Sequence, residues 1–304
     1  MRVAVTGATG IVGRFVCARL LAQGHTVQAL CRPTSITAGF TQQPHWVVGE
    51  LDEESALQQL LEGMEAVVHC AFSHVTGRYR GGEGDDVQGF WRTNLGGTLH
   101  LLETSQHAGV QRVVLLSSRA VFGRRRPGED PHSAVDDDHP LWPGTHYGAL
   151  KAAEEALATA YPAMAVCALR PTGVYGLTFP LERSKWFELA SDVIAGTSTT
   201  ASRSATEVHG RDVAAAVTCL LEAAADQVRG RGFNCSDITL STRELVREIA
   251  TRAGLQAELP PASPAVVNPM RCDALRNLGW QPGGMERLSR TLDELVQCVL
   301  ASRQ

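Results

Sequence analysis

The sequence predicts an α/β protein built on a doubly wound parallel sheet, with a smaller C-terminal lobe. Three observations carry this prediction: a strand, glycine turn, helix and strand in the first thirty residues, the continuation of that alternation, and its weakening after about residue 172. Strands that alternate with helices form parallel sheets covered on both faces. With 304 residues, the chain is long enough to bury a substantial core.

The first thirty residues carry the clearest pattern. Residues 2–6 (RVAVT) are a short β-branched run, which is typical of a strand. A helical stretch with apolar residues on one face follows the glycine turn to about Gln23, and Gly24 ends it. Residues 26–30 read as the next strand, so this region is predicted to be a βαβ unit.

The same alternation continues along the chain. Further strands are predicted at 46–48, 66–70, 112–116, 165–169 and 232–235. Helices are predicted at roughly 53–62, 86–108, 147–160, 181–195, 211–225 and 242–253, with a terminal helix near 285–302. Two loops rich in glycine, proline and charge, at 77–86 and 123–143, leave the carboxyl ends of strands, where open α/β sheets bind ligands.

Composition excludes several classes of protein. The 28 Lys and Arg residues against 32 Asp and Glu give a net charge of −4, which provides no basic field for a nucleic-acid backbone. No apolar run is long enough for a membrane span, and the N-terminus lacks the layout of a signal peptide. The eight cysteines are scattered without metal-ligand spacing. We therefore expect a soluble, cytoplasmic protein with reduced thiols and no metal, nucleic-acid or membrane partner.

The glycine turn predicts a dinucleotide site. Gly7, Gly10 and Gly13 lie between a strand and a helix, where a phosphate can approach the backbone and the helix N-terminus. A tight turn without a ligand is the alternative reading of the same glycines. We expect this turn to bind the cofactor through Gly7, Thr9, Gly10, Ile11, Val12 and Gly13.

The end of the second strand bears on the choice of cofactor. NAD sites usually carry an acid there for the ribose hydroxyls, whereas a cation suits the 2′-phosphate of NADP. The segment Ala29-Leu30-Cys31-Arg32 lacks the acid and supplies a guanidinium. NADP is therefore favoured as the cofactor. The alternative is that Arg32 is an ordinary surface residue and that the cofactor is NAD.

A second set of residues predicts proton-transfer chemistry. Tyr147 and Lys151 lie four residues apart at the start of a helix and so share one face. An ammonium group nearby favours the phenolate, which can accept or donate the proton that accompanies hydride transfer. Ser118 follows the strand at 112–116 and can orient a substrate oxygen, although the Ser117-Ser118 pair can also simply end the strand.

Taken in order, the motifs resemble the extended short-chain dehydrogenase/reductase family, which includes sugar-nucleotide epimerases and NADP-dependent carbonyl reductases. The motifs are TGATGIVG, VVHCA, TNLGGT, LLSSRAVFG, YGALK and LRPTGVYG, which span residues 1 to about 235, and the C-terminal tail is also similar. The resemblance implies that Tyr147 is the catalytic acid/base, Lys151 its partner on the ribose and Ser118 the substrate-positioning serine. It further implies cofactor contacts from Glu50, Leu51, Ala71 and Asn94.

The resemblance also implies a domain organisation. Residues 1–172 are expected to form a dinucleotide-binding domain of the Rossmann type, to which 206–236 returns. Most of 173–304 is expected to form the smaller substrate-binding lobe. Helices 86–108 and 147–160 form dimer seams in relatives, so a homodimer is one expectation.

The chain departs from the sugar-nucleotide members at three places. Gly173 stands where they usually carry Asn, Ala205 stands where they tend to carry a diphosphate-binding Arg, and Arg119 and Ala120 replace the acids of the dehydratases. Arginines in the two loops can meet an anionic substrate or pair with nearby acids in a solvated loop; they include Arg78, Arg80, Arg119 and Arg124.

These observations predict an NAD(P)-dependent oxidoreductase that transfers hydride at a carbonyl or secondary alcohol of a small substrate, anionic or sugar-like. Two alternatives remain open. One is a nucleotide-sugar epimerase with tightly held NAD(P), and the other is a non-catalytic regulator that senses NADP.

Overall fold

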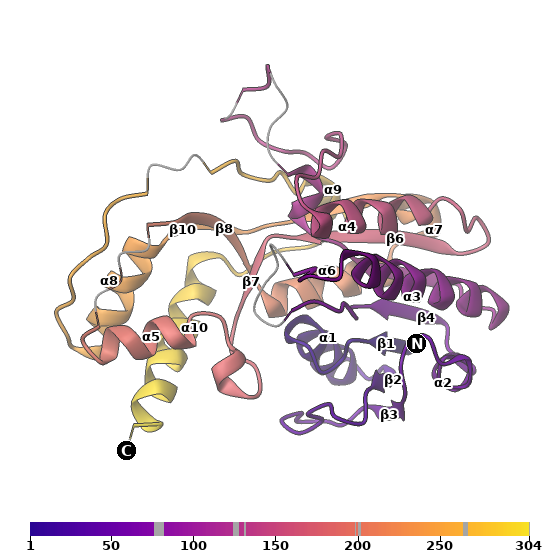
Figure 1. Ribbon diagram of the computed structural model, residues 1–304, viewed down its shortest axis with the longest axis horizontal. Helices are drawn as coiled ribbons and strands as arrows, with labels where there is room; N and C mark the ends of the chain where they lie inside the picture. The colour runs from indigo at the N-terminus through magenta and orange to yellow at the C-terminus, as the bar shows by residue number, and fades with distance from the viewer. Residues whose placement is uncertain are drawn as a thin grey trace.

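A seven-stranded parallel sheet forms the centre of the molecule (Figure 1). The computed structural model describes residues 1–75, 82–123, 128–130, 132–197, 199, 202–263 and 267–303. The strand order is β3-β2-β1-β4-β5-β6-β9. The strands are β1 (Arg2–Thr6), β2 (Thr26–Cys31), β3 (His45–Val48), β4 (Ala66–His69), β5 (Arg112–Leu116), β6 (Ala165–Pro171) and β9 (Gly232–Cys235). The order reverses between β1 and β4, and such a switch point is where open α/β sheets bind their ligands.

The sheet confirms the predicted doubly wound fold. All seven predicted strands are present and each pair of neighbours is parallel. β6 runs two residues past its predicted end because Arg170 and Pro171 pair with Asn234 and Cys235 of β9. That extension carries the edge of the sheet toward the smaller lobe.

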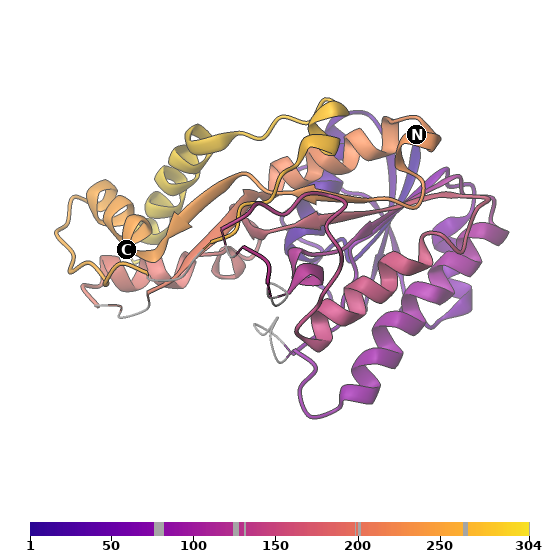
Figure 2. The same ribbon diagram turned by 90° about the horizontal axis from the view of Figure 1, so that it is seen from above.

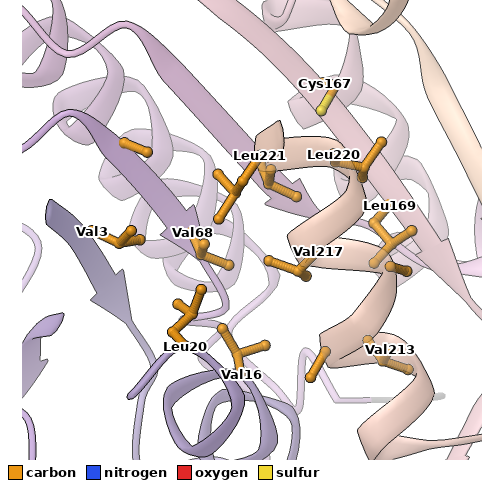
Figure 3. Packing of buried hydrophobic residues seen from close by; sticks show 14 of the residues in the cluster. Val3, Val16, Leu20, Val68, Cys167, Leu169, Val213, Val217, Leu220 and Leu221 are labelled. Carbon is orange, nitrogen blue, oxygen red and sulfur yellow. The ribbon is translucent and has the colours of Figure 1, made fainter. Parts of the chain in front are cut away.

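Helices cover both faces of the sheet (Figure 2). One face packs against α1 (Ile11–Ala22) and α6 (Gly210–Glu222), and the other against α2 (Glu54–Leu61), α3 (Val87–His107) and α4 (His146–Leu157). Figure 3 shows Leu20 of α1 and Val217 of α6 in the apolar layer on Val68 of β4. Two short helices, α7 (Ala225–Val228) and α9 (Asp273–Asn277), lie near β6 and β9.

The smaller lobe contains a second sheet, of order β10-β8-β7, which the sequence analysis did not predict. Its strands are β7 (Gly173–Tyr175), β8 (Ser204–His209) and β10 (Ile238–Ser241), and its helices are α5 (Phe187–Ile194), α8 (Thr242–Ala253) and α10 (Gly284–Ala301). The single helix predicted at 181–195 is wrong. Trp186, at a φ of 72°, separates a 3-10 turn at Leu181–Arg183 from α5, because left-handed backbone cannot continue a helix.

A chain of buried polar groups crosses the core beneath the carboxyl edge of the sheet. His69, at the end of β4, contacts Thr6 Oγ1 of β1 through Nδ1 at 2.6 Å and Thr98 Oγ1 of α3 through Nε2 at 3.0 Å. Burial, together with the nearby Lys151 ammonium, lowers the pKa of His69 to about 3. The imidazole is therefore neutral at physiological pH.

All eight cysteines are free, and burial raises the pKa of Cys70 and Cys167 to about 12. Thiols held in this protonated form are poor nucleophiles. Across the described ranges, every helix is too short or too polar to cross a bilayer.

The packing of α1 on α6 leads to a first prediction. Leu20 is buried between these helices, so Leu20→Ala removes apolar contacts and leaves a cavity that lowers the free energy of unfolding by ~2–5 kcal/mol. Urea denaturation measures this loss. The neighbouring Leu21 is only partly buried, and Leu21→Ala is the matched control with the same change in helix propensity. Equal losses in the two variants would contradict the described packing.

The neutral His69 leads to a second prediction. The unfolded chain takes up a proton near the usual histidine pKa, whereas folded His69 does so only near 3. The free energy of unfolding therefore falls on acidification, by roughly 2 kcal/mol for this one group between about pH 7 and pH 5. His69→Gln should reduce the measured acid sensitivity of the unfolding free energy by that amount. His45→Gln, at an exposed histidine, is the control, and an acid sensitivity unchanged by His69→Gln would refute the assignment.

Candidate active site

Two backbone segments meet at the glycine turn after β1. Gly7 has a φ of +66°, and a Cβ placed there would lie 2.4 Å from the backbone nitrogen of Ala71. Ala71 follows β4, so the turn lies at the switch point of the sheet. At Gly13 a Cβ would lie 2.2 Å from the Gly7 carbonyl oxygen. Only glycine allows these two approaches, which explains the spacing noted in the sequence.

The N-terminus of α1 opens at this turn. Gly10 is the N-cap residue and has no side chain to cap the helix, and the first turn carries no acid. Thr9, Ile11 and Val12 flank the cap. The backbone N–H groups and the positive end of the helix dipole therefore face this edge without an internal anion, which is the arrangement that binds phosphate.

Arg14, which the sequence analysis did not single out, fastens the loop after β2 to the glycine turn. Its guanidinium donates to the carbonyl oxygens of Thr9 at 3.2 Å and Ala38 at 2.7 Å, and also to that of Ile36. It also lies 4.6 Å from the centre of the Phe40 ring. The sequence did contain a signal for this role, because Arg14 is a charged residue directly after Gly13 on a helix face that is expected to be buried.

Arg32 begins the loop that Arg14 holds. It directly follows β2, which pairs with β1, and its side chain is exposed. Its backbone N–H donates to Ser35 Oγ at 3.1 Å, and its carbonyl accepts from the Ser35 N–H at 2.9 Å. This turn fixes the backbone of Arg32, which directly follows the strand beside β1.

Glu50 and Leu51 follow β3 at the same edge. Leu51 contacts α3, since a Cβ at Gly97 would lie 3.2 Å from its side chain, and its carbonyl oxygen lies 2.7 Å from His100 Nδ1. Glu50 is exposed. The pair therefore borders the outer part of the edge, two strands away from β1.

Asn94 of α3 binds the segment that follows β4. Its Oδ1 accepts from the backbone N–H of Ser73 at 2.7 Å, and its Nδ2 donates to the carbonyl oxygens of Ser73 and Phe90, each at 2.9 Å. Both amide hydrogens are thus engaged. Asn94 fixes the segment that follows Ala71 and acts on the edge through that segment.

A third close backbone approach joins the segments that carry Ser118 and Tyr147. Ser118 begins a 3-10 turn, η1 (Arg119–Phe122), and its Oγ accepts from the Ala120 N–H at 3.2 Å. Gly148 follows Tyr147 in the first turn of α4, and a Cβ there would lie 2.3 Å from the Ala120 carbonyl oxygen. The missing side chain lets α4 press against η1, and Ser118 and Tyr147 directly precede these two elements or lie in their first turn.

Phe72 and Lys151 complete the surroundings of Tyr147. The Phe72 ring meets the Tyr147 ring edge to face, with centroids 5.1 Å apart. Lys151 Nζ lies 4.3 Å from the centre of the Phe72 ring and donates to Glu154 Oε2 at 2.8 Å. The buried ammonium is therefore held on the same face of α4 as the tyrosine.

Ser117 has a separate role. Its hydroxyl donates to Glu155, which also forms a buried ion pair with Arg170 of β6, 2.7 Å from Nη2 to Oε2. This group ties α4 to the ends of β5 and β6. The Ser117 hydroxyl is thereby engaged in the fold, whereas the Ser118 hydroxyl caps η1.

Of the four loop arginines named above, the structure describes the contacts of one. Arg119 donates from Nη2 to the Asn268 carbonyl oxygen at 2.9 Å, which joins η1 to the C-terminal segment. Arg78, Arg80 and Arg124 lie outside the described residues.

At Gly173, where the sequence departs from sugar-nucleotide enzymes, the space for a side chain is filled. A Cβ there would lie 2.2 Å from Glu207 Oε2 and 2.5 Å from Lys185 Nζ. These two groups form an ion pair at the start of the smaller lobe. An asparagine at 173 would have to displace it.

Comparisons with known proteins agree with this geometry. Residues 3–236 match the model of the NAD dependent epimerase/dehydratase family. The crystal structure of UDP-glucose 4-epimerase from Thermus thermophilus in complex with NAD aligns with a TM-score of 0.78 and 25% identity, covering 97% of this chain and 99% of that one.

Two curated relatives match over shorter stretches. The 3 beta-hydroxysteroid dehydrogenase/Delta 5-->4-isomerase of Mycobacterium tuberculosis is 30% identical over 187 residues, or 58% of this chain and 47% of that protein. The UDP-glucose 4-epimerase of Streptomyces lividans is 31% identical over 163 residues, or 51% of this chain and 46% of that protein. The chain thus spans less than half the length of each. Because the family model covers most of the chain, the protein belongs to the NAD-dependent epimerase/dehydratase family of extended short-chain dehydrogenases/reductases.

Proposed function

We propose that the protein catalyses NAD(P)-dependent hydride transfer at a carbonyl or secondary alcohol of a small substrate, anionic or sugar-like, with Tyr147 as the proton donor or acceptor. The packing of Gly148 on Ala120 supports the proposal, because it joins the backbone segments that carry Ser118 and Tyr147. We propose most of 173–304 as the lobe that holds the substrate, and 1–172 with 206–236 as the cofactor domain.

The chain's residues fit a dinucleotide. The glycine turn offers a cradle without side chains at Gly7, and Gly10, Thr9, Ile11, Val12 and Gly13 surround an uncapped helix N-terminus suited to a pyrophosphate. We assign Glu50 and Leu51 to the adenine side, Ala71 and the Asn94-held segment to the wall of the site, and Lys151 to the ribose. When bound, the cofactor supplies or accepts the hydride.

Ser118, Tyr147 and Lys151 divide the remaining chemistry. The Ser118 hydroxyl accepts from the Ala120 N–H and keeps its proton to donate to the substrate oxygen. Tyr147 gives that oxygen a proton during reduction and takes one during oxidation. The Lys151 ammonium favours the phenolate form of Tyr147 and so makes both transfers easier.

We further propose NADP as the preferred cofactor, with NAD as the alternative. Cys31 ends β2 where NAD enzymes usually carry an acid, and the exposed Arg32 follows it. A guanidinium offers two parallel hydrogen bonds to a phosphate and keeps its charge at any working pH.

A nucleotide-sugar epimerase is the second candidate, favoured by similar proteins such as the UDP-glucose 4-epimerases of Thermus thermophilus and Streptomyces lividans. The ion pair of Lys185 and Glu207 in the space beside Gly173 weighs against it. Retention of the cofactor distinguishes the two functions, because an epimerase must re-reduce its own intermediate. Stoichiometric NAD(P) in the purified protein would favour the epimerase. A cofactor that exchanges freely with the solution would favour the oxidoreductase.

Tyr147→Phe tests the proposed chemistry. Loss of the proton donor should reduce turnover by about 10²–10⁴-fold, whereas the fold and the cofactor affinity remain close to wild type. The measurement is NAD(P)H consumption with a panel of aldehydes, ketones, sugar acids and nucleotide sugars. Undiminished turnover would refute the mechanism, and a wild-type protein that binds cofactor but turns over no substrate would favour the NADP-sensing regulator.

Arg32→Ala tests the cofactor assignment. Hydrogen bonds to charged groups contribute roughly 1.5–3 kcal/mol, so NADP affinity should fall about ten- to a hundredfold and NAD affinity should hardly change. Fluorescence titration of both reduced cofactors measures this, and added salt should narrow the difference because Arg32 is exposed. Cys31→Asp combined with Arg32→Ala should reverse the preference. An equal loss for both cofactors would assign Arg32 to the surface alone.

A further inference from the structure

Glu154 is a buried carboxylate that the proposed chemistry does not use. Its Oε2 accepts from Lys151 Nζ at 2.8 Å, and the two side chains are only 3% and 4% exposed. Its Oε1 accepts from Thr98 Oγ1 of α3 at 3.1 Å. Burying two charges costs more free energy of desolvation than an ordinary ion pair returns, so stability alone does not account for the pair.

The surrounding hydrogen bonds are all consistent with an ionised Glu154. Neutral His69 has one N–H, and placing it on Nε2 lets His69 donate to Thr98 Oγ1 while Nδ1 accepts from the Thr6 hydroxyl. The Thr98 hydroxyl has one hydrogen, which can then go to Glu154 Oε1 at 3.1 Å or to the Asn94 carbonyl oxygen at 2.9 Å. Thr6 Oγ1 in turn accepts from the Ala71 N–H at 3.3 Å. This network leaves Glu154 Oε1 as an acceptor beside the Thr98 hydroxyl, as an ionised carboxylate requires.

The neighbouring acid does not replace Glu154. Glu155 points to the other side of α4, where it binds Arg170 and Ser117. Glu154 is therefore the carboxylate in contact with the Lys151 ammonium, which also lies over the face of the Phe72 ring.

We propose that Glu154 is a positioning residue for the Tyr147–Lys151 pair: its carboxylate fixes the ammonium against Phe72 and offsets part of the positive field that reaches the Tyr147 phenol. The role in catalysis rests on the proposed function. The electrostatic effect on Tyr147 is a property of the protein itself and needs no substrate.

Other titratable groups face the same pair. They are His69 and Cys70 at the end of β4, His74 in the segment after it, and Glu155 on α4 with its partner Arg170 in β6. Burial lowers the pKa of both histidines and raises that of Cys70 to about 12, so these three stay uncharged near neutral pH. Glu155 is neutralised by Arg170. The charge that a variant at position 154 changes is thus mainly that of Glu154.

Glu154→Gln tests the proposal, because glutamine keeps the shape and an acceptor for Lys151 but removes the negative charge. The seven-residue spacing places Glu154 about 10 Å from Tyr147 along the helix axis, close enough for one charge to act on the phenol. In the variant, tyrosinate at position 147 should therefore form at a lower pH than in the wild type, because the ammonium's field is no longer offset.

The measurement is an alkaline titration of tyrosinate absorbance in the purified protein. Subtracting the titration of Tyr147→Phe isolates the signal of Tyr147. Burial raises the pKa of Tyr161 and Tyr175 above the usual range, so these two ionise later. Glu154→Asp restores the charge and should bring the pKa of Tyr147 back toward wild type. If the glutamine variant does not fold, Glu154→Met removes the same charge with an apolar side chain of similar length.

Glu103→Gln is the matched control. Glu103 accepts from the Tyr161 hydroxyl at 2.7 Å, so this variant should change the ionisation of Tyr161 and leave that of Tyr147 in place. A pKa of Tyr147 that is unchanged, or raised, in both charge-removing variants at 154 would overturn the proposal. That result is separate from failure of the proposed function, which would show instead as undiminished turnover in Tyr147→Phe.

Discussion

Close backbone packing at the carboxyl edge of the large sheet is the constraint on which the rest of the site depends. At Gly7, Gly13 and Gly148 an added Cβ would lie 2.2–2.4 Å from a neighbouring backbone atom. The first two approaches join the ends of β1 and β4 and open the N-terminus of α1. The third sets the first turn of α4, which carries Tyr147, against η1, which Ser118 precedes. Glycine is needed there for contact distance, and only at Gly7 also for a positive φ.

Two consecutive acids on α4 then fix what the close packing brings together. Glu154 faces α3 and holds Lys151, whereas Glu155 faces β5 and β6 and holds Arg170 and Ser117. Consecutive helical residues point about 100° apart, so one helix can be anchored on two sides by adjacent side chains. Because buried ion pairs contribute little net stability, their effect lies in fixing the orientation of α4. That orientation decides where the first turn of α4, with Tyr147, meets the edge of the sheet.

The sequence was informative where local pattern and tertiary structure agree. The strand at 2–6, the helix at 242–253 and the glycines of the turn follow from short-range signals: a β-branched run, the Ser241–Glu244 capping box and residues without side chains. β7, β8 and β10 have three to six residues and owe their form to pairing between segments more than thirty residues apart. Arg14 and Glu154 were missed for a related reason. A charge on a helix suggests solvent, and only the packed structure supplies the carbonyl oxygens around Arg14 and the ammonium beside Glu154.

The connection between the two sheets explains how the smaller lobe, which we propose to hold the substrate, can be fixed relative to the proposed catalytic residues. The chain leaves the large sheet after β6 and returns at His209, which ends β8 and caps α6 by accepting from the Arg211 N–H at 2.9 Å. Burial lowers the pKa of His209 to about 3, so Nδ1 stays available as an acceptor. The His209 ring also contacts Phe15 of α1 and Tyr175 of β7 edge to face, with centroids 5.5 Å and 5.0 Å apart. One neutral side chain thus links the helix of the glycine turn, the strand that begins the smaller lobe and the helix that returns to the sheet. If the His209 imidazole were charged, Nδ1 could no longer accept from the Arg211 N–H, and the ring would pack less well against Phe15 and Tyr175. The position of α1 relative to the smaller lobe therefore depends on a histidine that stays neutral.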